Sequence, residues 1–453
     1  MDASFDVIVV GAGAGGLLTA ARLTRLGYRT LVAERLAHLG GRASTRDVDG
    51  FKVNNGAIVI ETGGITEQTF AEVGATFDVR TPDPPILYRV GGRDVDVTGG
   101  GWGFLLSRLT RHGARVLAGL AEARRDEGLP DGELSTADWL ARFTRNQAVH
   151  GVFRSMCGSV FAVGLDELPA RVFLTYFTRK SAFKRFGFCP RGTGGLWTPL
   201  AAAITDRGGE VWLRSEVRSL TMADGLVSGA VIDRHGQALL APGGTTPPNP
   251  PGKVTRVAAR VVISDVGPAA TVRLLGPDTL PPEYTEAVKR ADRPCAMISV
   301  NFASTEPLLA APGLLSFAGT RRLCYAANFT ATCPEMAPDG WHLYVGTAVP
   351  RPATGDFDET AETALLLADL HDEIGGFDRA RILSTVVTRD DWPPQRAVAG
   401  SDLPPGTPVA NLWNVGDGVK EYANGGITAC AETAQIVACQ VAERYPADLT
   451  PRP

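Results

Sequence analysis

The hydrophobic pattern near the start of the chain predicts a strand, a helix and a second strand in quick succession. Residues 7–10 (VIVV) form an uninterrupted apolar run, which is typical of a strand buried on both faces of a sheet. Residues 17–26 continue as a helix, and residues 30–33 (TLVA) form the next apolar run. Glycines fill the turn between the first strand and the helix. We therefore expect a β-α-β unit at the start of an α/β fold.

The glycines of this turn have the spacing of a dinucleotide-binding loop. Gly11 permits the tight turn, Gly13 lets the backbone approach a diphosphate, and Gly16 lets the helix pack closely on the sheet. The helix N-terminus directs free N–H groups and the positive end of its dipole at the anion. Glu34 ends the second strand, where a carboxylate binds an adenosine ribose and repels a 2′-phosphate. The alternative is a loop without a ligand, but the order of elements favours an adenine dinucleotide.

A second glycine pair indicates FAD rather than NAD. Gly40-Gly41-Arg42 follow the ribose acid, where a simple dehydrogenase would begin a helix. An arginine beside exposed backbone N–H groups forms a further anion cradle, which suits a long cofactor that extends past its diphosphate. The alternative is an ordinary loop that ends in a surface arginine.

The C-terminal part, residues 411–445, supplies a third element. A short apolar strand precedes Gly416-Asp417, and Gly425-Gly426 open a long helix. Asp417 can hydrogen-bond a ribityl chain, and the helix N-terminus can stabilise the anion formed when a flavin ring is reduced. The alternatives are a turn or cap role for Asp417 and a helix start without a ligand. Three elements that each suit a different part of FAD favour this cofactor.

These motifs together resemble the FAD-dependent amine oxidase and phytoene desaturase superfamily, and they are closer to its desaturase branch. The resemblance also rests on residues 49–60 (DGFKVNNGAIVI), 192–220 and 259–276, and it spans the whole length. It implies non-covalent FAD, because no cysteine stands where covalently flavinylated relatives attach the cofactor. The residues that the motifs and the resemblance assign to FAD are Gly11, Gly13, Ala14, Gly15, Gly16, Glu34, Arg35, Gly41, Arg42, Ala43, Gly56, Ala57, Ile58, Val217, Gly416, Asp417, Gly426 and Ile427.

The same resemblance implies two domains. The first is a Rossmann-type, discontinuous FAD-binding domain made of residues 1–70, 192–289 and 400–453. The second is an α+β substrate domain, a mixed sheet floored by helices, made of residues 71–191 and 290–399. Ser135 is expected to cap a helix in the first insert, and the proline-rich stretch 242–253 is expected to be an exposed hairpin loop.

Two departures from the family pattern affect the expected function. Asn55 stands where many relatives carry aspartate, which puts one family contact in doubt. The C-terminal motif lacks the aromatic pattern with which amine oxidases cage an amine, and this disfavours an amine oxidase.

Composition excludes several other classes. A formal charge of −4 argues against nucleic acid as a partner. The seven cysteines include no C-x-x-C pair and resemble small buried residues in a reducing compartment, and the six scattered histidines suggest no metal site. No signal peptide and no apolar run long enough to span a bilayer are evident. These features predict a cytoplasmic protein, and the sequence leaves its oligomeric state open.

Two stretches keep a peripheral membrane contact open. Residues 171–188 combine six aromatic side chains with five basic ones, which could line an apolar substrate tunnel or touch a membrane. Residues 102–120 are a candidate basic amphipathic helix. Core packing with a solvated basic face is the alternative for both stretches.

The sequence supports three functions. The first is a desaturase or dehydrogenase that removes a hydride and a proton across a C–C bond of an apolar or alicyclic substrate, carotenoid-like or smaller. The base need not be strong if the substrate carries a neighbouring carbonyl that acidifies the C–H bond. The others are a flavin amine oxidase and a non-catalytic binding protein of the escort type. Without a second glycine fingerprint, oxygen or a quinone is the expected electron acceptor. Tyr422 is a candidate for proton transfer, or a packing tyrosine; Arg154 is a candidate for holding a substrate carbonyl, or a surface charge.

Overall fold

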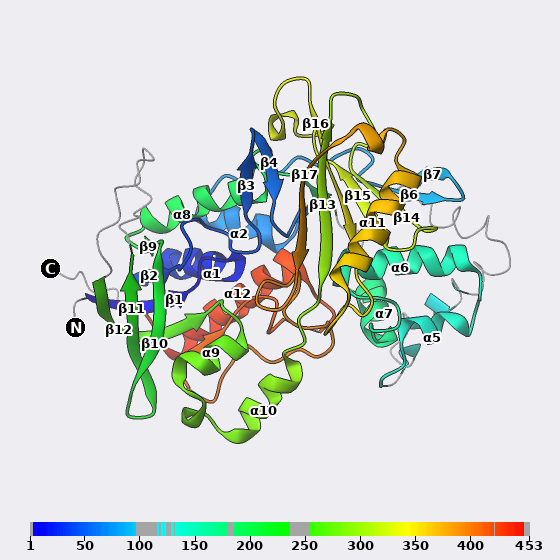
Figure 1. Ribbon diagram of the computed structural model, residues 1–453. Coiled ribbons are helices and arrows are strands. Elements are labelled where there is room, and N and C mark those ends of the chain that lie inside the picture. The colour runs from blue at the N-terminus through cyan, green and yellow to red at the C-terminus, as the bar shows by residue number, and fades with distance from the viewer. Residues whose placement is uncertain are drawn as a thin grey trace.

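The fold consists of two seven-stranded sheets side by side (Figure 1). The computed structural model describes residues 3–96, 116, 119–120, 122–123, 128–130, 132–179, 185–235, 253–420 and 422–447. The first sheet has the order β10-β11-β12-β1-β2-β9, with β18 paired to β12 beside this path. Its strands are β1 (Ala3–Val10), β2 (Thr30–Ala33), β9 (Glu210–Trp212), β10 (Ser215–Ala223), β11 (Leu226–Arg234), β12 (Lys253–Ser264) and β18 (Leu412–Asn414).

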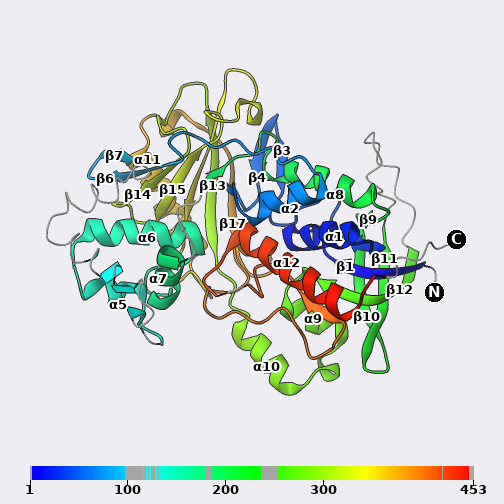
Figure 2. The same ribbon diagram turned by 180° about the vertical axis from the view of Figure 1, so that it is seen from behind.

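Helices cover one face of this first sheet. α1 packs against α12, α8 and α2, and Figure 2 shows α12 running alongside α1. The four helices and the sheet enclose one apolar core, in which Leu17, Leu200 and Val437 are fully buried. The bounds are α1 (Ala14–Arg25), α2 (Ile65–Val73), α8 (Trp197–Thr205) and α12 (Gly426–Arg444). On the opposite face, α9 (Pro268–Leu275) contacts β10, and α10 (Pro282–Ala291) contacts α9.

The second sheet is mixed and has the order β17-β13-β16-β15-β14-β6-β7. β14 runs parallel to β6, and the other neighbours are antiparallel. α11 (Glu359–Glu373) covers one face, and α6 (Gln147–Phe161) covers the other with α7 (Ala170–Arg179) next to it. The strands are β6 (Ile86–Val90), β7 (Arg93–Asp96), β13 (Met297–Ser304), β14 (Leu314–Phe317), β15 (Leu323–Asn328), β16 (His342–Ala348) and β17 (Arg381–Thr388).

Short elements connect the two sheets. Two small ladders pair β3 with β4 and β5 with β8. Their bounds, with those of the remaining helix and 3-10 turns, are β3 (Thr45–Val48), β4 (Phe51–Asn54), β5 (Ile60–Glu61), β8 (Phe186–Gly187), α5 (Thr136–Ala141), η2 (Thr193–Leu196), η3 (Pro277–Thr279), η4 (Pro334–Met336) and η5 (Phe377–Arg379).

The predicted fold class is confirmed: a Rossmann-type α/β layer lies beside a mixed sheet with helices. The strands of the first sheet come from residues 3–33, 210–264 and 412–414, and those of the second come from residues 86–96 and 297–388. Ser135 caps α5 by accepting a hydrogen bond from the Asp138 N–H, although this helix spans only Thr136–Ala141. Residues 242–252, and most of the candidate helix at 102–120, lie outside the described residues.

Two expectations about the surface can be compared with the described residues. Six of the seven cysteines are buried, as expected, but Cys439 on α12 is exposed, so the expectation is wrong for this residue. Within the described part of the chain, no helix is long and apolar enough to cross a membrane.

Candidate cofactor and substrate site

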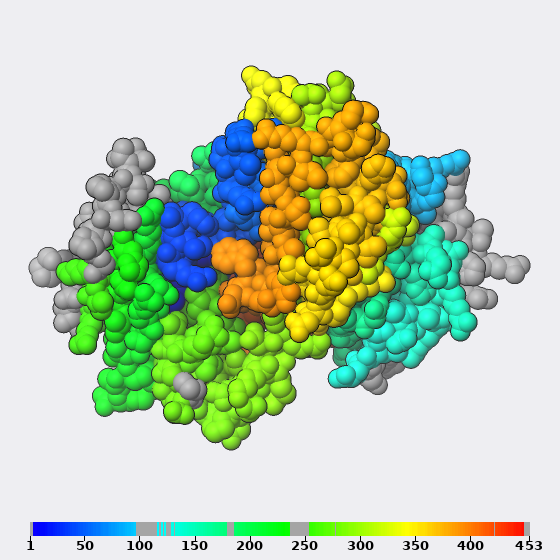
Figure 3. Space-filling model, in the orientation of Figure 1, coloured from blue at the N-terminus to red at the C-terminus, as the bar shows by residue number. Residues whose placement is uncertain are grey.

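A cavity of about 460 Å³ opens where the carboxyl ends of three parallel strands meet the second sheet. β1, β12 and β18 are neighbours, so the loops that follow them lie at one edge of the sheet. This edge is where open α/β sheets bind ligands. In the space-filling view, the surface is hollowed where the orange segment near residue 390 meets the blue N-terminal part and the green part around α9 and α10 (Figure 3).

Most residues predicted to bind the cofactor line this one cavity. They are Gly11, Gly13, Ala14, Glu34, Arg35, Gly41, Arg42, Ala43, Gly56, Ala57, Ile58, Val217, Asp417, Gly426 and Ile427. Gly15, Gly16 and Gly416 do not line it. They instead allow close packing behind it, because a Cβ atom added at Gly15 would lie 3.0 Å from the Gly416 nitrogen, and one at Gly16 would lie 2.2 Å from the Gly11 carbonyl oxygen.

Glu34 is held rigidly at one end of the cavity. It is 5% exposed, its Oε2 accepts a hydrogen bond from the Ala12 N–H at 2.7 Å, and its Oε1 accepts one from the Leu36 N–H at 2.7 Å. Each carboxylate oxygen keeps a lone pair for a further donor. Val217 lines the same cavity as Glu34.

The N-terminus of α1 reaches the cavity, and its N-cap residue supplies no side-chain cap. Gly13 is the N-cap residue and has no side chain that could accept from the first N–H groups of the helix. Unpaired N–H groups and the helix dipole make such an end an anion site. The geometry therefore suits the diphosphate of a dinucleotide.

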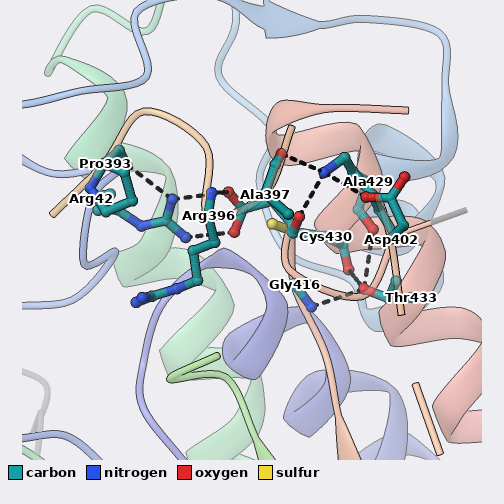
Figure 4. Close-up of polar contacts among 11 residues, drawn as sticks. Arg42, Pro393, Arg396, Ala397, Asp402, Gly416, Ala429, Cys430 and Thr433 are labelled. Atoms are coloured by element: carbon teal, nitrogen blue, oxygen red, sulfur yellow. Dashed lines mark hydrogen bonds and ion pairs between the residues drawn. The ribbon is translucent and has the colours of Figure 1, made fainter. Parts of the chain in front are cut away.

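Arg42 and Asp417 form a two-bond ion pair on the cavity wall. Arg42 donates from Nη1 to Asp417 Oδ2 at 2.9 Å and from Nη2 to Oδ1 at 2.5 Å, and Asp417 Oδ2 also accepts from the Arg396 N–H at 3.0 Å (Figure 4). Burial alone would raise the pKa of Asp417, but Arg42, Arg396 and Lys420 hold it below its usual range. Each residue has a protein partner, so the pair is equally compatible with a redox enzyme and with a binding protein of the same fold.

A buried lysine supports this wall from behind. Lys420 donates to the carbonyl oxygens of Ala397 at 3.1 Å and Asp417 at 2.9 Å, and its Nζ lies 2.8 Å from Asp402 Oδ1 (Figure 4). The loop that carries Asp417 is thereby tied to the segment that carries Arg396.

Asp265 was not predicted, yet its carboxyl lies in the middle of the glycine loop. It directly follows β12 and lines the cavity. Burial raises its pKa to about 7, against the lowering effects of the Gly16 N–H and the charges of Arg42 and Arg396. An acid directly after a buried strand was the sequence signal that could have identified it.

A cluster of buried polar groups lies at the other end of the cavity. Gln395 is 4% exposed, and its Nε2 donates to the Val160 carbonyl oxygen at 2.8 Å. Ser159 Oγ, Gln395 Oε1 and Arg396 Nε are buried without a hydrogen-bond partner, and all three residues line the cavity. Buried polar atoms are normally paired, so these atoms indicate that the cavity holds a ligand with polar groups.

The two candidate catalytic residues do not lie on this cavity. Tyr422 is 40% exposed and lines a separate cavity of about 230 Å³ with Asp402 and Lys420. Arg154 on α6 donates from Nη1 to the Thr320 carbonyl oxygen at 3.5 Å, and burial followed by the charge of Arg351 lowers its pKa. The structure therefore brings neither side chain to the predicted cofactor residues.

The comparisons with known proteins agree with this geometry. Residues 14–442 match the family of flavin containing amine oxidoreductases. The chain is 26% identical over 261 residues to a neurosporene-forming phytoene desaturase of Rhodobacter capsulatus. The matched region covers 49% of this chain and 48% of that protein. Among solved structures, an oxidoreductase from Methanosarcina mazei superposes with a TM-score of 0.82 at 26% identity, covering 95% of this chain and 99% of that one. Putrescine oxidase bound to putrescine shares the fold, with a TM-score of 0.65 at 17% identity over 97% of this chain and 99% of that one.

The cofactor of this chain is FAD. The cavity residues fit it, because one cavity is lined by the predicted ribose acceptor Glu34, by Gly13 and Ala14 at the N-terminus of α1, and by Ser159, Gln395 and Arg396, which carry unpaired polar atoms. The glycine loop, the Arg42 segment and the start of α12 line the same cavity.

Proposed function

The chain belongs to the flavin-containing amine oxidoreductase family, and on that basis we propose that it is an FAD-dependent desaturase or dehydrogenase that acts on a C–C bond of a small apolar or alicyclic substrate. Bound FAD supplies a two-electron acceptor for this chemistry. The observation that carries the proposal is the absence of a buried acidic side chain from the described lining of the cavity on the side of the second sheet, where a substrate would lie; the charged residues on this side are Arg396 and Asp391, which lies on an exposed turn.

Apart from Arg396 and Asp391, the lining on that side is apolar or neutral. Its uncharged residues are Ser159, Val160, Ala162, Met297, Tyr325, Thr388, Gln395 and Ile427. Of the acids among the described lining residues, Glu34 and Glu216 lie at the first sheet, Asp265 and Asp417 lie at the glycine loop, and Asp391 lies on an exposed turn after β17. A buried ammonium group needs a paired charge or several hydrogen bonds. A lining without a buried acid on this side therefore favours a substrate without a positive charge.

Anaerobic bleaching of the bound flavin tests the proposal. The holoenzyme is mixed with three probe classes at matched concentration: a polyene hydrocarbon, a cyclic ketone with α,β-hydrogens, and a primary amine. We expect the flavin band to bleach with the hydrocarbon or the ketone, with one new C=C bond per flavin reduced. Dithionite is the control that shows the flavin to be reducible. Bleaching by the amine alone would contradict the proposal.

An amine oxidase remains the second candidate because of two aromatic residues. Tyr325 and Trp392 are the aromatic residues among the described cavity lining, and aromatic faces can bind an ammonium ion. Peroxide release in air with amines, but not with ketones or hydrocarbons, would favour this function. A non-catalytic escort-type protein would show no bleaching with any substrate class. For the desaturase, we propose oxygen or a quinone as the electron acceptor.

A further inference from the structure

The carboxyl group of Asp265 occupies space that the glycine loop leaves free. A Cβ atom added at Gly13 would lie 2.4 Å from Asp265 Oδ2, one at Gly15 would lie 2.5 Å from Oδ1, and one at Gly416 would lie 2.9 Å from Oδ1. Any side chain at Gly13 or Gly15 would therefore collide with this carboxyl. The glycines accommodate an acid from the neighbouring strand as well as a close approach to a ligand.

This acid lies at the same helix end that binds the cofactor's diphosphate. Gly13, Ala14 and Asp265 line one cavity, and the Gly16 N–H of the first turn of α1 hydrogen-bonds the Asp265 carboxyl. Two anions at one helix N-terminus repel each other across a few ångströms of low-dielectric protein. A neutral carboxyl removes the repulsion, and its O–H can donate to a phosphate oxygen.

We propose that Asp265 contacts the diphosphate of FAD as a neutral carboxylic acid, so that binding of the cofactor takes up one proton from solvent. The proton neutralises the carboxylate, and no other bond changes.

The charged groups around Asp265 are consistent with this state. Arg42 and Arg396 attract its negative charge, but Arg42 is already paired with Asp417, which repels it. Cys430 on α12 also faces it, and residues 11–16 carry no titratable side chain. With these neighbours the pKa of Asp265 already stands at about 7. A diphosphate adds further negative charge, which raises the pKa again.

The pH dependence of FAD release from the holoenzyme tests the proposal. Holoenzyme is diluted at pH values between about 6.5 and 9, and free FAD is measured by its fluorescence. If one proton is bound with FAD, the dissociation constant rises about tenfold per pH unit above about pH 7. Asp265→Asn keeps the shape without the charge and should make the constant nearly independent of pH in this range. Asp292→Asn is the matched control, because this exposed acid does not line the cavity, and it should keep the wild-type slope.

A proton count on the unmodified protein covers the case in which Asp265→Asn fails to fold. Wild-type holoenzyme is diluted in weakly buffered indicator dye at about pH 8, and the protons released per FAD released are measured. We expect close to one proton per FAD, since Asp265 would then return to its ionised form. A count near zero, or the same slope in wild type and Asp265→Asn, would overturn the proposal. Neither readout depends on the substrate or on turnover.

Discussion

Arg42 and Asp417 are 375 residues apart in the sequence and are joined by two hydrogen bonds within one ion pair. The side chain of Asp417 is only 4% exposed and that of Arg42 is 22% exposed. The pair thus fastens the N-terminal glycine segment to the C-terminal motif on one wall of the FAD cavity.

Removing one partner of this pair should destabilise the protein strongly. Asp417→Ala leaves the Arg42 guanidinium buried without its counter-charge, and we expect a loss of about 3–5 kcal/mol in the free energy of unfolding, measured in urea. The control is Glu286→Ala, which removes the exposed pair with Lys289 and should cost far less. Equal losses in the two variants would show that the Arg42–Asp417 pair is not buried as described.

The same pair should make stability fall in acid. The pKa of Asp417 is depressed in the folded state, so its contribution is present above the unfolded pKa of about 3.9 and is lost as pH falls through the lower folded value. Below about pH 4, the free energy of unfolding of the wild type should therefore fall more steeply than that of Asp417→Asn. Urea titrations of both proteins at several pH values measure the two slopes, and parallel slopes would contradict the assignment.

Glu34→Ala should weaken FAD binding. The variant loses the ribose acceptor and leaves the N–H groups of Ala12 and Leu36 without theirs. We expect a loss of about 2–3 kcal/mol, or tens- to about a hundredfold in the dissociation constant. Fluorescence of FAD released on dilution reports the change. Glu210→Ala, on the adjacent β9 but outside the cavity, should retain wild-type occupancy, and full occupancy in Glu34→Ala would show that the ribose lies elsewhere.

FAD should be released completely by heat or acid. Cys430 is the cysteine among the described cavity lining, and burial raises the pKa of its thiol far above its usual range. A neutral thiol is a poor nucleophile, so we expect no bond to the flavin. A denaturing gel viewed for flavin fluorescence provides the measurement. A fluorescent band that disappears in Cys430→Ser would show a covalent bond at this residue.

NADH and NADPH should reduce the bound flavin slowly or not at all. The chain has one dinucleotide fingerprint, which the FAD site uses, and Glu34 there disfavours a 2′-phosphate. Anaerobic stopped-flow at the flavin band measures the rate. Reduction by NADPH at about 1–10³ per second, the range of ordinary turnover, would point instead to a reductase that runs the double-bond chemistry in the opposite direction.

The local part of the site could be predicted from sequence because its signals are contiguous. β2 spans Thr30–Ala33 as expected, and α12 begins at Gly426. Asp265 and Gln395 escaped prediction because strand order and loop packing, rather than a motif, bring them to the cavity.

The direction of their side chains explains why the two candidate catalytic residues, Tyr422 and Arg154, lie outside the cofactor cavity. Tyr422 precedes Ala423, whose φ of 65° turns the chain in the left-handed region, and the tyrosine reaches a separate cavity. Arg154 is next to Ser155, whose hydroxyl donates a hydrogen bond to the Cys324 carbonyl oxygen of β15. This bond holds that part of α6 against the second sheet. Along α6, Ser159 is the first described residue that lines the cavity, and it lies more than one helical turn after Arg154. Neither direction can be read from residue type and spacing alone.

The pairing of β18 with β12 also sets the order in which a growing chain can acquire its cofactor. A ribosome releases the N-terminal loop and Glu34 first, and domains fold as their segments emerge. The strand that positions Asp417, and the helix that begins at Gly426, emerge long after that loop. A nascent chain therefore carries an incomplete FAD site until the segment around Asp417 has been synthesised.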